Sequence, residues 1–149
     1  MSTKQFIKSE ILRQLEVKIH ELSIAIKSAE ESRDADSKSS VGDKHETSRA
    51  KIQTEIDQLS KQLDNSKKQK NVLLGIDLAK KHNSAKVGSL IETNNGVYFI
   101  SIGWGQVLVN SHKFFVISTA SPIGQVLHSK KKGDRFKFRN LNFIVNEIS

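Results

Sequence analysis

Residues 12–29 read LRQLEVKIHELSIAIKSA, and the apolar positions in this stretch decide the first half of the fold. They recur at alternating spacings of three and four residues, at Leu12, Leu15, Ile19, Leu22, Ile26 and Ala29. This spacing is the a/d heptad pattern, which places one narrow apolar seam along an α-helix. The pattern therefore predicts a long helix over residues 4–32 that packs by its seam against another helix.

A second seam follows after a polar interval. It consists of Ile52, Ile56, Leu59 and Leu63, and it continues through Ser66 and Lys70 to Leu73. Two of its later positions are polar, but the heptad spacing is unbroken and the remaining faces hold Glu, Lys, Gln and Ser. We predict a second helix over residues 44–73.

The interval between the seams is where the chain reverses. Residues 33–43 are rich in serine and aspartate, with Gly42 as a turn residue and Asp43 as a candidate N-cap. Two arms of equal length, each about 45 Å long from the helical rise, favour an antiparallel hairpin. Residues 30–46 hold six acids against three bases, so we expect an acidic tip near residues 33–46 in a chain whose net charge is +8.

From Lys86 onward the apolar pattern changes to a period of two, which is typical of β-strands. Residues 87–102 read as a hairpin around Asn94-Asn95-Gly96, and further strands are expected at 106–110, 114–118, 135–139 and 142–148. One short helix begins at Ser121-Pro122, with serine as N-cap and proline in the first turn. The predicted fold class is α+β: a coiled-coil hairpin at 1–75, a linker at 76–85, and a small antiparallel β domain with one short helix at 86–149.

Composition excludes several classes of function. The chain has 149 residues, of which 36% are hydrophobic and 27% charged, and it contains no cysteine, which rules out disulfides and thiolate chemistry. The five histidines lack the spacing of a zinc site, and no phosphate-binding glycine loop or nucleophile elbow occurs. Charges interrupt the apolar residues at the start of the sequence, so we expect no signal peptide, and we expect no transmembrane span.

Positive charge is concentrated in the second half. Residues 76–149 hold ten Lys or Arg against four Asp or Glu, whereas residues 1–75 hold 14 against 12. The run Lys130-Lys131-Lys132 is suited to attracting phosphates, but the nearby aromatic residues follow strand periodicity and are expected inside the core. We therefore expect contact with nucleic acid held by a larger assembly rather than autonomous binding.

Asp43 and Glu46 are the one acidic pair that we single out as a candidate for chemistry. Residues three apart share a helix face, so both carboxylates can point to one place beyond the tip. One interpretation is a capping box, in which Asp43 is the N-cap and Glu46 its partner. The other is that the two carboxylates help to hold Mg²⁺ whose remaining ligands belong to another molecule.

Two stretches of the sequence resemble the bacterial GreA/GreB transcript cleavage factors, a family of transcription elongation factors. Ser121-Pro-Ile-Gly-Gln-Val-Leu-His-Ser-Lys-Lys-Lys-Gly-Asp134 is similar to the family's C-terminal signature, and Gly42-Asp43-Lys-His-Glu46 is similar to its Gly-Asp-x-x-Glu tip. The order of parts, a helical hairpin with an acidic tip followed by a small β domain, is also that of the family.

The resemblance implies an FKBP-like C-terminal fold and a cytoplasmic bacterial protein whose partner is RNA polymerase. In the family, the C-terminal domain grips the rim of the secondary channel, which assigns partner binding to Ser121, Pro122 and Ile123. The hairpin reaches the active centre, where Asp43 and Glu46 would assist the polymerase's own Mg²⁺ in cleaving a backtracked transcript. The resemblance thus implies a monomer that is not an enzyme alone, has no cofactor of its own, and contacts nascent RNA and DNA only indirectly.

Three alternatives stay open. The family usually continues Asn-(Ala/Ser)-Glu-Tyr after the tip glutamate, whereas Thr47-Ser48-Arg49-Ala50 follows here, and one alternative is a regulator that occupies the channel without stimulating cleavage. Another is a structural coiled-coil interaction protein, because a heptad pattern indicates how helices pack and does not indicate a function. The third, a prolyl isomerase or chaperone, needs an aromatic-lined pocket, and the chain has only one Trp and one Tyr.

Overall fold

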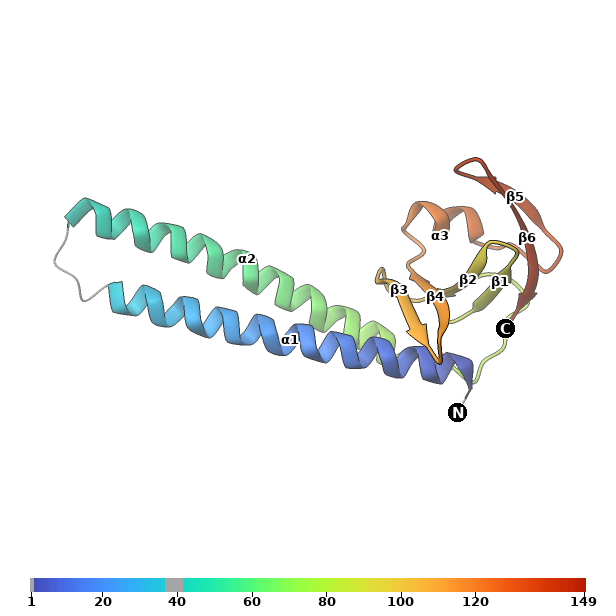
Figure 1. The fold of residues 1–149 in the computed structure, drawn as a ribbon, viewed down its shortest axis with the longest axis horizontal. Helices are drawn as coiled ribbons and strands as arrows, with labels where there is room; N and C mark the ends of the chain where they lie inside the picture. Colours follow the sequence, from blue (N-terminus) through green and yellow to red (C-terminus); the bar gives the residue numbers. More distant parts are fainter. Residues whose placement is uncertain (1, 37–41) are drawn as a thin grey trace. The chain divides into compact units, whose positions relative to one another are not determined.

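The computed structural model describes residues 2–36 and 42–149, and at residues 36 and 42–45 it describes the backbone alone. Two long helices, α1 (Thr3–Asp36) and α2 (Gly42–Leu74), precede six strands and one short helix (Figure 1). The predicted α+β class is confirmed. Both predicted helices are present, and α1 continues past residue 32 to Asp36.

Contacts divide the chain into two compact units, which we call the hairpin unit and the sheet unit. The hairpin unit is Gln14–Lys70, and the sheet unit combines Met1–Arg13 with Asn71–Ser149. The first turns of α1 and the last turn of α2 therefore belong to the sheet unit. The predicted domain boundaries at residues 75 and 86 stay a prediction.

Two side-chain contacts establish that the helices of the hairpin unit run antiparallel. Lys70 Nζ lies 3.4 Å from Glu16 Oε1, and Arg33 Nη1 donates a hydrogen bond to Gln53 Oε1 at 2.8 Å. Between these contacts both helices advance by 17 residues, α1 from Glu16 to Arg33 and α2 backwards from Lys70 to Gln53. The register of the pair is therefore constant over this length.

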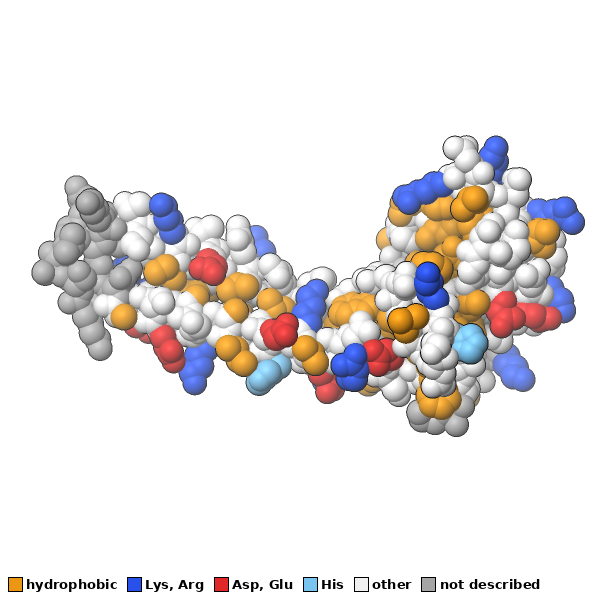
Figure 2. All heavy atoms as spheres, in the orientation of Figure 1, with side chains coloured by type: hydrophobic (Ala, Val, Ile, Leu, Met, Phe, Trp, Pro, Cys, Tyr) orange, Lys and Arg blue, Asp and Glu red, His pale blue; other side chains and the backbone are white. Residues whose placement is uncertain are grey.

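The predicted seam is the interface of this pair. On α1, Leu15, Leu22 and Ala29 are buried, and Leu12, Ile19 and Ile26 are half-buried. On α2, Ile56 and Ser66 are buried, and Ile52, Leu59, Leu63 and Lys70 are half-buried. On the face drawn in Figure 2, acidic and basic side chains lie scattered along both helices, as expected for surfaces that face water.

Ser66 is an unusual member of the seam. Its side chain is fully buried, and its hydroxyl has no hydrogen-bond partner. A buried hydroxyl without a partner costs about 1–3 kcal/mol relative to one that is satisfied. The heptad therefore keeps its spacing here at the expense of stability, because a small side chain stands where most seam positions hold a large apolar one.

The six strands of the sheet unit are β1 (Leu90–Thr93), β2 (Gly96–Ile100), β3 (Gly105–Val109), β4 (His112–Ile117), β5 (Arg135–Phe138) and β6 (Leu141–Ile148). They form one sheet in the order β3-β4-β2-β1-β6-β5, so that β3 and β5 are its edges. All neighbours are antiparallel except β2 and β4, which are parallel. The parallel pair is the one departure from the predicted antiparallel pattern, and it arises because the β3–β4 hairpin folds back with β4 beside β2.

The predicted turn at Asn94-Asn95-Gly96 joins β1 to β2. Gly96 has φ +117°, a conformation that favours glycine, and the Thr93 hydroxyl donates to the Gly96 carbonyl at 2.8 Å. The core behind the sheet contains Ala85, Ile91, Tyr98, Ile100, Ile117, Leu127, Phe143 and Val145. In the described part of the chain, no helix combines the length and the apolar character needed to cross a bilayer.

The seam can be tested by two substitutions on α1 that differ only in the face they occupy. Leu22 is 8% exposed and Ile24 is 54% exposed. We expect Leu22→Asp to lower the free energy of unfolding of the hairpin unit by about 3 kcal/mol, because it buries an unpaired charge. Ile24→Asp should change it by less than about 0.5 kcal/mol. Urea denaturation followed by far-UV circular dichroism measures both, and equal effects would mean that the seam is wrongly assigned.

Candidate functional site

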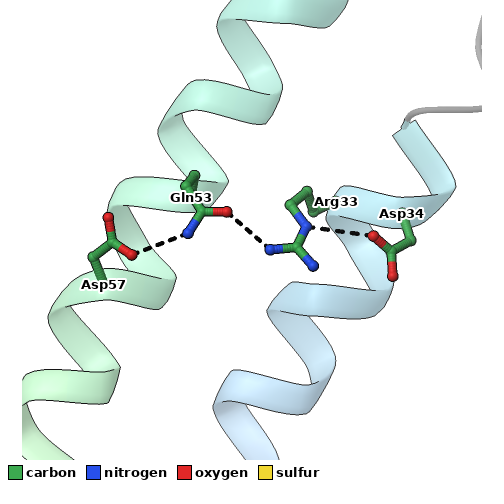
Figure 3. Close-up of polar contacts among 4 residues, drawn as sticks. All are labelled: Arg33, Asp34, Gln53 and Asp57. Carbon is green, nitrogen blue, oxygen red and sulfur yellow. Dashed lines mark hydrogen bonds and ion pairs between the residues drawn. The ribbon is translucent and has the colours of Figure 1, made fainter.

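The predicted site residues fall in two places, one in each unit. In the hairpin unit, α1 and α2 are joined close to the end of α1 by a chain of polar side chains (Figure 3). Besides its bond to Gln53, Arg33 donates through Nε to Asp34 Oδ1 at 3.3 Å, and Gln53 Nε2 donates to Asp57 Oδ1 at 3.0 Å. This network holds the two helices together where the apolar seam ends.

Arg33 is a residue whose role the sequence did not reveal. It appeared only as one of three bases in an acidic stretch, since its partner Gln53 lies on the other helix and no spacing links the two. Its side chain is 26% exposed in the ion pair with Asp34, whose side chain is 65% exposed. Because Asp34 is so accessible to water, the ion pair itself adds little stability, and the contribution of Arg33 is mainly to fix the register.

The predicted acidic pair lies at the start of α2. The helix begins at Gly42, so Asp43 lies one residue inside it and not at the N-cap position before it; the Asp43 side chain lies outside the described residues. Glu46 is in the same helix and is exposed. Two residues three apart in one helix share a face, so the convergence of the two carboxylates stays a prediction consistent with the backbone.

In the sheet unit, Ser121, Pro122 and Ile123 form a loop-to-helix corner at the start of α3 (Pro122–Leu127). Ser121 has extended backbone angles, φ −67° and ψ 155°, and its hydroxyl accepts a hydrogen bond from the Gly124 amide at 3.0 Å. The same hydroxyl donates to the Ser118 carbonyl at 2.7 Å. The predicted serine N-cap and proline in the first turn are therefore confirmed, and Pro122 itself is exposed.

Gly124 makes this corner possible. A Cβ atom at this position would lie 2.0 Å from the Ser118 carbonyl oxygen and 2.8 Å from the Ser121 hydroxyl. Neither neighbour can move freely, because one is backbone and the other is held by two hydrogen bonds. Sequence reasoning did not single out this glycine, since its requirement comes from a backbone segment that approaches the helix in space.

An apolar surface adjoins the corner. Among the half-buried side chains that pack against the core of the sheet are Phe115, Ile123, Phe136 and Phe138. α3 contacts β5, which carries two of these aromatic rings, and Figure 2 shows apolar side chains gathered where Figure 1 draws α3. We call this set the apolar rim.

Cations lie over the rings of the apolar rim. Lys130 Nζ is 5.9 Å from the ring centre of Phe136, and Arg139 Cζ is 5.0 Å from that of Phe138. Phe136 also stacks on Phe143, with 4.8 Å between ring centres. The corner and the adjoining apolar rim together present an exposed proline, half-buried aromatic rings and positive charge. Such a surface is suited to bind a partner whose surface is partly apolar and partly acidic.

No family model matches the chain, and no curated protein matches it. A search of solved structures finds similarity to "the transcription factor Gfh1", with 20% sequence identity, 95% of this chain and 92% of that chain covered, and a TM-score of 0.35. Within the part of the chain that the structure describes, no group of three or more His, Asp or Glu side chains is placed to hold a metal ion.

Gly124 generates a test of the corner. We expect Gly124→Ala to lower the free energy of unfolding of the sheet unit by about 2–3 kcal/mol, because the new methyl group overlaps the Ser118 carbonyl. Gly103→Ala is the matched control, since its Cβ would meet nothing closer than 3.7 Å. Urea denaturation followed by the fluorescence of Trp104, the only tryptophan, reports on this unit. If both variants unfold at the parent's midpoint, the corner is not as tight as described.

Proposed function

We propose that this protein regulates RNA polymerase by inserting its hairpin unit into the secondary channel while the corner at Ser121–Ile123 binds the channel rim. The observation that carries the proposal is the antiparallel hairpin. Within the hairpin unit, α1 extends over about 35 Å (residues 14–36) and α2 over about 44 Å (residues 42–70) at the helical rise of about 1.5 Å per residue. The hairpin is held in constant register by the Glu16–Lys70 and Arg33–Gln53 contacts, and α2 carries Asp43 and Glu46 in its first turns.

The architecture suits a probe for a narrow channel. An interface of only two helices leaves charged residues on the other faces, and those faces stay hydrated inside a polar channel. The motif-level resemblance of residues 42–46 and 121–134 to the transcript cleavage factors supports RNA polymerase as the partner. We propose further that the protein acts as a monomer.

The role proposed for Asp43 and Glu46 is to hold and orient the Mg²⁺ ion of the polymerase active centre. Two carboxylates sharing one helix face are suitable ligands for Mg²⁺, and the remaining ligands would come from the polymerase. A metal ion at that place lowers the pKa of bound water and stabilises charge on a phosphodiester. The protein supplies position and negative charge and acts on the polymerase's own active centre, so it is not an enzyme by itself.

A regulator that occupies the channel without stimulating cleavage is the second candidate. The observation that favours it is the sequence after Glu46, where Thr47-Ser48-Arg49-Ala50 provides neither an aromatic residue nor another acid. Arg49 and Ala50 are exposed, so these two side chains are available to the partner. The two candidates share the same docking and differ only in what happens at the tip.

The tip is tested by a charge-neutralising double variant. We expect Asp43→Asn plus Glu46→Gln to abolish stimulated transcript cleavage by stalled elongation complexes while polymerase affinity changes less than about threefold, because amides keep the shape and lose the anionic ligands. Glu55→Gln plus Asp64→Asn, at two exposed positions farther along α2, is the matched control and should stimulate cleavage as the parent does. Undiminished cleavage by the tip variant would remove this pair from the mechanism. A parent that stimulates no cleavage would favour the second candidate, and nucleotide addition should then be measured with the same variants.

Docking is tested at the exposed proline. We expect Pro122→Glu to weaken binding to RNA polymerase about tenfold, a loss of about 1.4 kcal/mol, without unfolding the sheet unit. Glutamate is tolerated in the first turn of a helix, where its charge faces the positive end of the helix dipole. Leu108→Glu, at a side chain that is 59% exposed on β3, introduces the same charge elsewhere and should bind like the parent. Equal affinity of the two variants, measured by co-sedimentation, would exclude the corner as the docking site.

A further inference from the structure

A second site lies in the sheet unit, in the segment that follows α2. An open pocket of about 560 Å³ is formed there by residues 75–77, 80, 82, 86 and 87 together with Thr119 and His128. Its volume lies within the range of pockets that hold small molecules in proteins. No part of the proposed polymerase regulation uses this pocket.

The pocket has an apolar part and a cationic part. Ile76, which is half-buried, and Val87 provide apolar surface. Lys80, Lys86 and His128 are exposed and line the same pocket, as does His82, which is only 8% exposed. Asp77 is the single acid in the lining. The site therefore offers a surplus of positive charge beside a surface on which an organic group can rest.

Gly88 keeps space open next to the buried histidine. Its φ is +91°, and a Cβ atom there would lie 3.4 Å from His82 Nε2 and 3.1 Å from Ile76 Cγ2. Any larger residue would therefore be strained and would fill the space beside the imidazole. The glycine amide is itself fixed, since it donates to the Ile100 carbonyl at 2.8 Å.

The charges around His82 favour an anionic occupant. Burial lowers the pKa of His82, and the positive charges of Lys4 on α1, Lys80 and Lys86 lower it further. Asp77 alone acts in the opposite direction. At neutral pH the imidazole is therefore uncharged and lies in a region of positive potential. An anion that entered the pocket would be attracted by the lysines and would in addition favour protonation of His82.

We propose that this pocket binds a small phosphorylated organic molecule, with Lys80, Lys86 and His82 on the phosphate and Ile76 and Val87 against the organic part. A phosphate carries about two negative charges and several acceptor oxygens, which matches two ammonium groups and one imidazole better than a single carboxylate does. The exposed lysines are mobile point charges, so binding weakens as salt rises.

The site couples phosphate binding to pH. Because an anion stabilises the protonated form of His82, protonation must stabilise the bound anion by the same free energy. Affinity therefore rises as pH falls through the pKa of His82 in the free protein, which lies below the usual 6.5. Asp77 and His128 in the lining and Lys4 from α1 are the other titratable groups that face the ligand or His82.

The test is an NMR titration of the full chain without polymerase, so its outcome is independent of the proposed function. The probes are inorganic pyrophosphate, adenosine monophosphate as a phosphate with an organic group, and adenosine as the uncharged comparison. At constant ionic strength we expect pyrophosphate to raise the pKa of His82, read from its ring protons, by about half a unit or more, because bound anions favour the charged imidazole. Adenosine monophosphate should bind and adenosine should not.

Matched variants distinguish a specific binding site from the general attraction of an anion to a basic surface. We expect Lys80→Gln plus Lys86→Gln to weaken pyrophosphate binding about tenfold or more. Lys113→Gln plus Lys137→Gln removes the same charge from exposed positions on β4 and β5 and should bind like the parent. The proposal is overturned if pyrophosphate leaves the pKa of His82 unchanged, or if both variants lose affinity equally. Binding of pyrophosphate but not of adenosine monophosphate would confine the site to inorganic phosphates and overturn the assignment of the apolar surface.

Discussion

The hairpin unit depends on one interaction, the burial of a single narrow apolar seam between two helices. Within this unit the helices have only each other to pack against, so every position on the seam contributes a larger share of the stability than it would in a globular core. The seam is also imperfect, since Ser66 is buried without a hydrogen-bond partner and Lys70 occupies a half-buried position. Apolar burial alone therefore holds the pair together without fully specifying its alignment.

Alignment comes from polar contacts at the margins of the seam. Glu16 with Lys70 and Arg33 with Gln53 lie 17 residues apart on both helices, and both pairs are satisfied in the same register. Each contact is partly exposed and contributes little stability. A shift of one helical turn would nevertheless break both together, so they discriminate between registers that the apolar residues alone distinguish poorly.

The sequence was informative where structure follows from local spacing. Heptad positions predicted the seam, and Ser121-Pro122 predicted the start of α3, because both signals depend on residues close together in the chain. The parallel pairing of β2 with β4, the bond between Arg33 and Gln53, and the need for glycine at residue 124 were not predicted. Each of these results from an approach in space between segments whose separation carries no periodic signal. The pocket around His82 was not predicted for the same reason, since residues 75–87 meet Thr119 and His128 only in the folded sheet unit. The predicted role of Asp43 and Glu46 at the tip stays a prediction, because the Asp43 side chain lies outside the described residues.

The two edges of the sheet differ in a way that affects the behaviour of the protein in concentrated solution. β5 carries Arg135 and Lys137, with Arg139 directly after it, and charges on an edge strand repel a second copy that approaches to extend the sheet. β3, at the opposite edge, reads GQVLV and has no charge, and its Leu108 is exposed. Unwanted strand pairing between copies is thus opposed at one edge and left unopposed at the other. A second copy that approaches along β3 therefore meets no like charge on the strand itself.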